Sequence, residues 1–74
     1  MAEIAVESEI AGTVWKLEKS VGDSVEEEDS LMILESMKME IPVLAPDTGK
    51  VVAIHVAEGD AVREGQVLAT LEFK

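Results

Sequence analysis

Two segments of the chain repeat one another, and the repeat decides the fold. The first reads EIAVESEIAGTVWKLEKSVGDSVEEEDSLMILE (residues 3–35), and the second reads EIPVLAPDTGKVVAIHVAEGDAVREGQVLATLE (residues 40–72). Aligned without a gap at an offset of 37, they share 12 identical residues over 33 positions. A repeat of this kind indicates one structural unit that occurs twice, each unit burying its apolar face against the other.

Within each copy, short stretches of alternating apolar and polar residues are bounded by glycine-containing turns, as is typical of β-strands. We expect strands near residues 3–6, 12–19, 24–26 and 31–35 in the first copy, and near 40–44, 49–56, 61–63 and 67–72 in the second. No segment has the pattern of a long amphipathic helix. The prediction is an all-β fold, a flattened barrel-sandwich hybrid of two antiparallel four-stranded sheets with pseudo-two-fold symmetry between the copies.

The symmetry also predicts where the two ends of the molecule lie. Residues 36–39 join the copies, and their counterparts under the repeat are Phe73-Lys74 and Met1-Ala2 at the chain ends. The 36–39 hairpin and the termini should therefore lie at opposite ends of the domain. Pro42 lacks a backbone N–H, so its strand is expected at the edge of a sheet or at a strand end.

Three residues stand out against the repeat. Glu28 occupies the place that Gly65 holds in the second copy, which should weaken that turn. Trp15, the only tryptophan, is expected to fill the core. His55, the only histidine, corresponds to Glu18 and is expected to face solvent. One histidine with scattered acids does not make a metal site.

Length and composition narrow the functional class. The 74 residues are expected to form one domain, 1–74, with a thin core and little room for a deep active-site pocket. The chain has no cysteine, no apolar run long enough to span a bilayer and no signal peptide, which favours a cytoplasmic protein. Its net charge of −10 disfavours nucleic acid and anionic membranes as partners. Met1 and a strand running to Phe73 favour a freestanding protein.

The junction of the repeat, residues 35–40, reads Glu-Ser-Met-Lys-Met-Glu and breaks the usual rules for a tight hairpin. Gly, Asn or Asp normally occupies the centre, where this chain has Met and Lys. A two-residue turn also sets Glu35 opposite Glu40, and opposed like charges are unfavourable. Lys38 could be an ordinary solvated lysine between two methionines that reach back into the core. Because several local rules fail together at the junction, a functional role for Lys38 is favoured.

The chain resembles the biotinyl/lipoyl attachment domain family over nearly its whole length, including its stand-alone attachment proteins and biotin carboxyl carrier proteins. The stretches that carry the resemblance are Gly12-Thr13-Val14-Trp15-Lys16, Val21-Gly22-Asp23-Ser24-Val25, Glu35-Ser36-Met37-Lys38-Met39-Glu40 and Val56-Ala57-Glu58-Gly59-Asp60. In this family the central lysine of Met-Lys-Met receives biotin in amide linkage. The resemblance therefore implies that Lys38 is the attachment residue. It implies flanking recognition roles for Met37, Met39, Glu35, Ser36 and Glu40.

The resemblance implies a carrier and not an enzyme. Biotin protein ligase would load Lys38, and the biotin would then carry carboxylate from a biotin carboxylase to a carboxyltransferase. Lipoyl members typically have an acidic residue before the lysine, so Met37 favours biotin over lipoate. A lipoyl carrier and an unmodified barrel-sandwich interaction module remain as alternatives. A Ser-Lys hydrolase built on Ser36 is disfavoured, because no oxyanion hole is expected.

Overall fold

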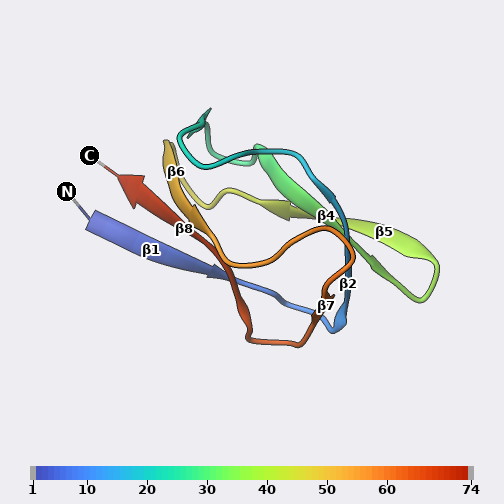
Figure 1. The fold of residues 1–74 in the computed structure, drawn as a ribbon. Helices are drawn as coiled ribbons and strands as arrows, with labels where there is room; N and C mark the ends of the chain where they lie inside the picture. The colour runs from blue at the N-terminus through green and yellow to red at the C-terminus, as the bar shows by residue number, and fades with distance from the viewer. Residues whose placement is uncertain (1, 74) are drawn as a thin grey trace.

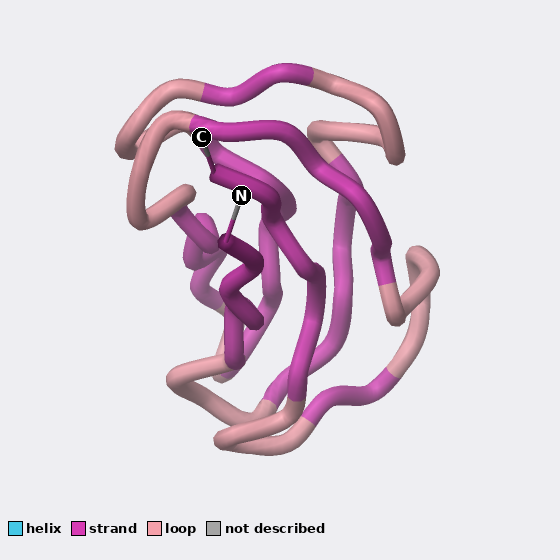
Figure 2. The backbone as a smooth tube through the Cα atoms, turned by 90° about the vertical axis from the view of Figure 1, so that its left-hand side faces the viewer, coloured by secondary structure: helices cyan, strands magenta, loops and turns pink. Residues whose placement is uncertain are grey.

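The computed structural model describes residues 2–73, which form eight β-strands joined by short turns. In chain order the strands are β1 (Ala2–Glu7), β2 (Gly12–Leu17), β3 (Ser24–Val25), β4 (Ser30–Ser36), β5 (Met39–Leu44), β6 (Gly49–Ile54), β7 (Ala61–Val62) and β8 (Val67–Phe73). Figure 2 shows only strand and loop in this part of the chain. The predicted all-β fold is confirmed. No helix among residues 2–73 is long and apolar enough to cross a membrane.

Each sheet takes strands from both copies of the repeat (Figure 1). One sheet has the order β1-β8-β6-β3 and the other the order β5-β4-β2-β7, with antiparallel pairing throughout. An offset of 37 residues turns β1 into β5, β4 into β8, β2 into β6 and β3 into β7, so the two orders interchange. The predicted pseudo-two-fold relation is confirmed, in two separate sheets and not one closed barrel. Pro42 lies in β5 at the edge of its sheet, as expected.

The core lies between the sheets and repeats residue by residue. Identical residues of the two copies make buried pairs of 0 to 3% exposure, namely Val14 with Val51, Val25 with Val62, Leu31 with Leu68 and Leu34 with Leu71. The buried side chains form two clusters, one around Leu34 and Leu68 and the other around Leu31 and Leu71. Half-buried Val43 and Ile54 each pack against both clusters and so connect them. Each fully buried side chain of this size contributes about 1.5–3 kcal/mol through burial. Four of the 12 identities that define the repeat are thus core positions in both copies.

The two Gly-Asp turns have the same hydrogen bond in each copy. An Oδ2 atom of Asp23 accepts from the backbone N–H of Ser20 at 2.9 Å, and Oδ2 of Asp60 accepts from Ala57 at 2.9 Å. The glycines before the aspartates have φ angles of 98° and 92°, a conformation that costs glycine little. The glycine-containing turns expected from the sequence are confirmed at these two places.

Strands β2 and β6 end two residues earlier than predicted, at Leu17 and Ile54. The backbone N–H groups of Glu18 and Lys19 both donate to one acceptor, the carbonyl of Leu31, at 3.0 and 3.2 Å. A shared acceptor interrupts the one-to-one ladder, so the chain leaves the sheet at this point.

Trp15 was expected in the core, and that expectation is wrong: 49% of the residue is exposed. The register of β2 against β4 shifts between Val14 and Lys16, which is a β-bulge. In a bulge, two residues of one strand oppose a single residue of the other. Trp15 and Lys16 therefore both lie opposite Ile33. Trp15 follows the buried Val14 and points to the outer side of the sheet, and the bulge returns Leu17 to the core side. The alternation of apolar and polar residues carries no sign of this shift.

The molecule is elongated, with extents of 36 × 18 × 17 Å. Ala2 pairs with Phe73 at one end, and the turn within residues 36–39 lies at the other (Figure 1). The predicted separation of hairpin and termini is confirmed for the described residues. Met1 and Lys74, which the symmetry argument also used, lie outside them.

Candidate functional site

The candidate site is the two-residue turn between β4 and β5. Ser36 pairs with Met39, and Glu35 pairs with Glu40, which leaves only Met37 and Lys38 in the turn. Their φ angles are 52° and 66°. Positive φ at both central positions defines a type I′ turn, which follows the right-handed twist of a hairpin and normally selects Gly, Asn or Asp. The sequence thus places two residues with a Cβ atom in a conformation that penalises them.

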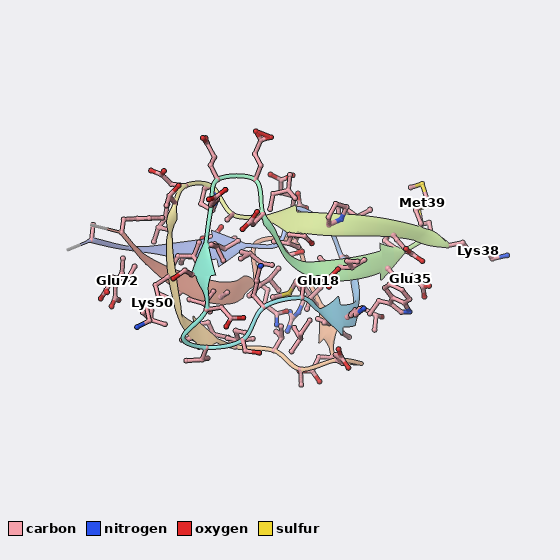
Figure 3. All side chains as sticks on the ribbon, turned by 90° about the horizontal axis from the view of Figure 1, so that it is seen from above. Glu18, Glu35, Lys38, Met39, Lys50 and Glu72 are labelled. Carbon is pink, nitrogen blue, oxygen red and sulfur yellow. The ribbon has the colours of Figure 1, made fainter. Side chains whose placement is uncertain are left out.

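The tip of the hairpin is solvated. Met37 is 88% exposed and Met39 is 58% exposed, so neither methionine reaches back to fill the core. Lys38 is also exposed, and Figure 3 shows its side chain pointing away from the body of the domain along the long axis. The arrangement therefore presents a primary amine at one end of the long axis of the part of the chain that the structure describes.

The stem beneath the tip is anchored in the core. Leu34 pairs with Ile41 and is 1% exposed, so the fourth residue before Lys38 is fixed by the interior. Between this anchor and the tip, Glu35 and Glu40 are exposed and lie directly opposite each other. Like charges in a cross-strand pair destabilise a hairpin. The stem is thus fixed at its base by the core, and the unfavourable pair of like charges lies on the exposed part near the tip.

All six residues singled out in the sequence, 35–40, are brought together in this one hairpin. His55 is exposed, as expected, and its Nε2 lies 2.9 Å from Oγ1 of Thr70. Among residues 2–73 no group of His, Cys, Asp or Glu side chains is arranged to hold a metal ion. An open groove of about 370 Å³ lies between β1 and β5, and Lys38 is not among the residues that line it. The chemistry available at the tip is therefore that of one accessible amine.

One feature beside the site escaped the reasoning from sequence. The exposed Trp15 lies on β2, next to β4 of the hairpin. The only available signal was the lack of an equivalent aromatic residue in the second copy, where Val52 stands.

Comparison with known proteins agrees with this geometry. Residues 2–71 match the family model for biotinyl/lipoyl domains, described as biotin-requiring enzyme. The biotin/lipoyl attachment protein of Bacillus subtilis is 44% identical over 68 residues, which are 92% of this chain and 93% of that protein. The biotin carboxyl carrier protein of Streptococcus mutans is 48% identical over 60 residues, which are 81% of this chain and 46% of that protein. The urea amidolyase of Saccharomyces cerevisiae is 44% identical over 71 residues, which are 96% of this chain but only 4% of that enzyme.

A solved structure gives the same result. The crystal structure of the Kluyveromyces lactis urea carboxylase superposes with a TM-score of 0.91 at 38% identity, over 97% of this chain and 6% of that enzyme. The chain therefore corresponds to nearly the whole of one small relative and to small parts of large ones. With the family model spanning residues 2–71, the chain belongs to the biotinyl/lipoyl attachment family.

Proposed function

We propose that the chain, as one carrier domain of residues 1–74, carries biotin covalently on Lys38. The observation that carries the proposal is the position of this lysine: the second residue of an exposed type I′ turn, at the end of the long axis. The relatives named as a biotin/lipoyl attachment protein and a biotin carboxyl carrier protein support the choice of cofactor.

The residues at the tip suit an acylation by a separate ligase. Acylation of a primary amine releases one proton from the nitrogen, which biotin protein ligase must take up. The free amine of Lys38 then attacks the acyl carbon of biotinyl-adenylate, an amide C–N bond forms, and AMP leaves with the electron pair of the broken C–O bond. Met37 and Met39 offer exposed, adaptable thioethers for the groove of the ligase. Glu35, Ser36 and Glu40 supply the polar flank of the same recognition segment.

The domain itself supplies position and not catalysis. When bound, biotin supplies a ureido nitrogen that carries carboxylate, and the protein fixes the point from which the arm swings. The partners we propose are a biotin carboxylase and a carboxyltransferase, each of which would receive the arm in turn. Relatives named as pyruvate carboxylase and propionyl-CoA carboxylase alpha chain support this assignment, with 37% and 38% identity. The acidic surface, with a net charge of −10, argues against nucleic acid as a partner.

Lipoate is the second candidate, because the same exposed amine can form the same amide with it. Lys38 cannot discriminate between the cofactors, so the neighbours that a ligase contacts must do so. Met37 is apolar and 88% exposed, which suits an apolar groove in a biotin protein ligase. An acidic residue in its place would bring a charge into that groove without a partner. Met37 therefore favours biotin.

The direct test is the intact mass of the chain after reaction with biotin, ATP and a biotin protein ligase. One biotinyl group should be added to the wild type and none to Lys38→Arg, which keeps the charge and the exposed position. Lys16→Arg and Lys50→Arg serve as controls and should be labelled as the wild type is. Labelling that persists in Lys38→Arg would refute the site. A wild type that accepts lipoate but not biotin would refute the cofactor, and one that accepts neither would favour an unmodified interaction module.

A further inference from the structure

The sheet that carries the hairpin has an apolar row across its outer face. In the register of β2, β4 and β5, Lys16 opposes Ile33 and Ile33 opposes Pro42. The bulge in β2 adds Trp15 to the same row. The row also contains the exposed Lys16, which follows Trp15 in the chain; we call its three apolar members, Trp15, Ile33 and Pro42, the apolar row. It combines a half-exposed indole, a half-buried isoleucine and an exposed proline on one surface.

The internal symmetry provides a control for this observation. The other sheet has the same bulge between Val51 and Ala53, and the row there consists of Val52, Ala53, Thr70 and Ala5. The backbone arrangement is therefore the same, but the side chains are small or polar. The fold does not need a tryptophan or an isoleucine at these outer positions, since its second half is built without them. In this row large apolar side chains occur on the hairpin sheet alone, and such a difference is typical of an interaction surface.

A second row, Thr13, Glu35 and Glu40, lies between the apolar row and the tip. It too differs from its counterpart on the other sheet. On the other sheet the row is Lys50, Glu72 and Glu3, in which Lys50 pairs with Glu72 and Glu72 with Glu3. Figure 3 shows the side chain of Lys50 near that of Glu72. On the hairpin sheet Thr13 replaces that lysine, and Glu35 and Glu40 face each other with no base in their row. A cation from a partner would relieve this repulsion. The complementary surface of a partner would therefore combine an apolar recess with basic residues beside it. Such a partner surface is opposite in charge to this chain, whose net charge is −10.

We infer that this face, the apolar row with Glu35 and Glu40, is the docking surface for biotin protein ligase. The inference rests on the proposed function. The ligase fits this face because it must act on an amine that lies very close to the hairpin. Before modification, the amine of Lys38 is joined to the turn only by the four methylene groups of its own side chain. The ligase must therefore bring its active site onto the hairpin itself. Ile33 lies three strand residues below the last strand residue, Ser36, a distance of about 10 Å. An enzyme that encloses the tip therefore covers this face as well.

The test exchanges the apolar row for its own symmetry counterpart. Trp15→Val with Ile33→Thr introduces the residues that Val52 and Thr70 already hold in the same backbone geometry. The matched control, Val52→Ala with Thr70→Ala, trims the equivalent row on the other sheet. Initial rates of biotinylation are measured by intact mass against carrier concentration, and folding is checked by circular dichroism. We expect KM to rise about tenfold in the hairpin-sheet variant, with kcat within about twofold and no change in the control.

A second measurement does not depend on catalysis. Trp15 is the only tryptophan, so fluorotryptophan incorporated into the Lys38→Arg chain gives a single ¹⁹F signal that reports on this face. Adding ligase should shift or broaden the signal, and Trp15→Phe should retain most of the wild-type KM.

An unchanged KM in a folded hairpin-sheet variant, or an unperturbed ¹⁹F signal at saturating ligase, would overturn the docking surface and leave biotinylation of Lys38 intact. Equal losses in the variant and the control would overturn it too. Failure of the proposed function looks different, because the wild type itself would then gain no biotin. If the double variant does not fold, the KM of Trp15→Leu is compared with that of Trp15→Phe. A KM in Trp15→Leu that is no higher than in Trp15→Phe would then overturn the docking surface.

Discussion

The strain in the hairpin turn gives the sharpest prediction. Met37 and Lys38 adopt φ angles of 52° and 66°, and the left-handed conformation costs a residue with a Cβ atom about 1–2 kcal/mol. Asparagine tolerates this conformation, because its short amide hydrogen-bonds to the local backbone. Met37 is 88% exposed, so the exchange removes little packing. Met37→Asn should therefore stabilise the domain by about 1 kcal/mol.

The gain is measured by urea unfolding and by the thermal midpoint. In a domain of this size 1 kcal/mol corresponds to a rise in Tm of about 4–8 °C. Met39→Asn is the matched control, since Met39 is also exposed but lies in β5 without a positive φ. Asparagine is a poor strand residue, so the control should gain nothing or lose a few tenths of a kcal/mol. A Met37→Asn domain no more stable than wild type, or a control that gains as much, would refute the role of turn strain.

Three further changes test the site and its frame. Met37→Asp should slow biotinylation and raise lipoylation by a lipoate ligase, followed by intact mass, and a folded variant biotinylated at the wild-type rate would remove Met37 as a selectivity determinant. Glu28→Gly should stabilise the domain by about 0.5–1 kcal/mol in urea, because Glu28 has a φ of 72° where Gly65 has 85°; an equal or lower stability would contradict this. Gly12→Ala would set a Cβ atom 2.5 Å from the carbonyl oxygen of Glu35 and should cost at least about 2 kcal/mol. A variant as stable as wild type would show that the strands can separate there.

The repeat predicts most of the fold in this protein, because four of its identical pairs are buried in both copies. Val14 with Val51 and Leu34 with Leu71 mark equivalent strands of the two copies, and the structure places one strand of each such pair in each sheet. The ends of the strands are harder to predict from the sequence, because they depend on hydrogen bonds such as the two that share the Leu31 carbonyl.

The position of Lys38 could be predicted, but the surface beside it could not. Two copies joined by a short link require a hairpin at the junction, and the symmetry sets that hairpin opposite the termini. Trp15 was misplaced because strict alternation puts it on the same face as Leu17, whereas the bulge between Val14 and Lys16 adds one residue and puts the two on opposite faces. Such a register shift depends on pairing with a strand distant in sequence. The positive φ of Met37 was likewise hidden, since methionine does not favour it.

Because Ala2 pairs with Phe73, both ends of the described chain lie together at one end of the domain, opposite the hairpin. Any flexible tether joined at that end, before β1 or after β8, would let the whole body rotate while Lys38 sweeps the far rim. With a body 36 Å long, the tip would explore a volume in which one amine corresponds to a concentration on the order of millimolar. The rigid sheets thereby extend the radius of search before any cofactor arm is added. Two catalytic centres several nanometres apart could then be served by rotation of one small body, with no change in its internal structure.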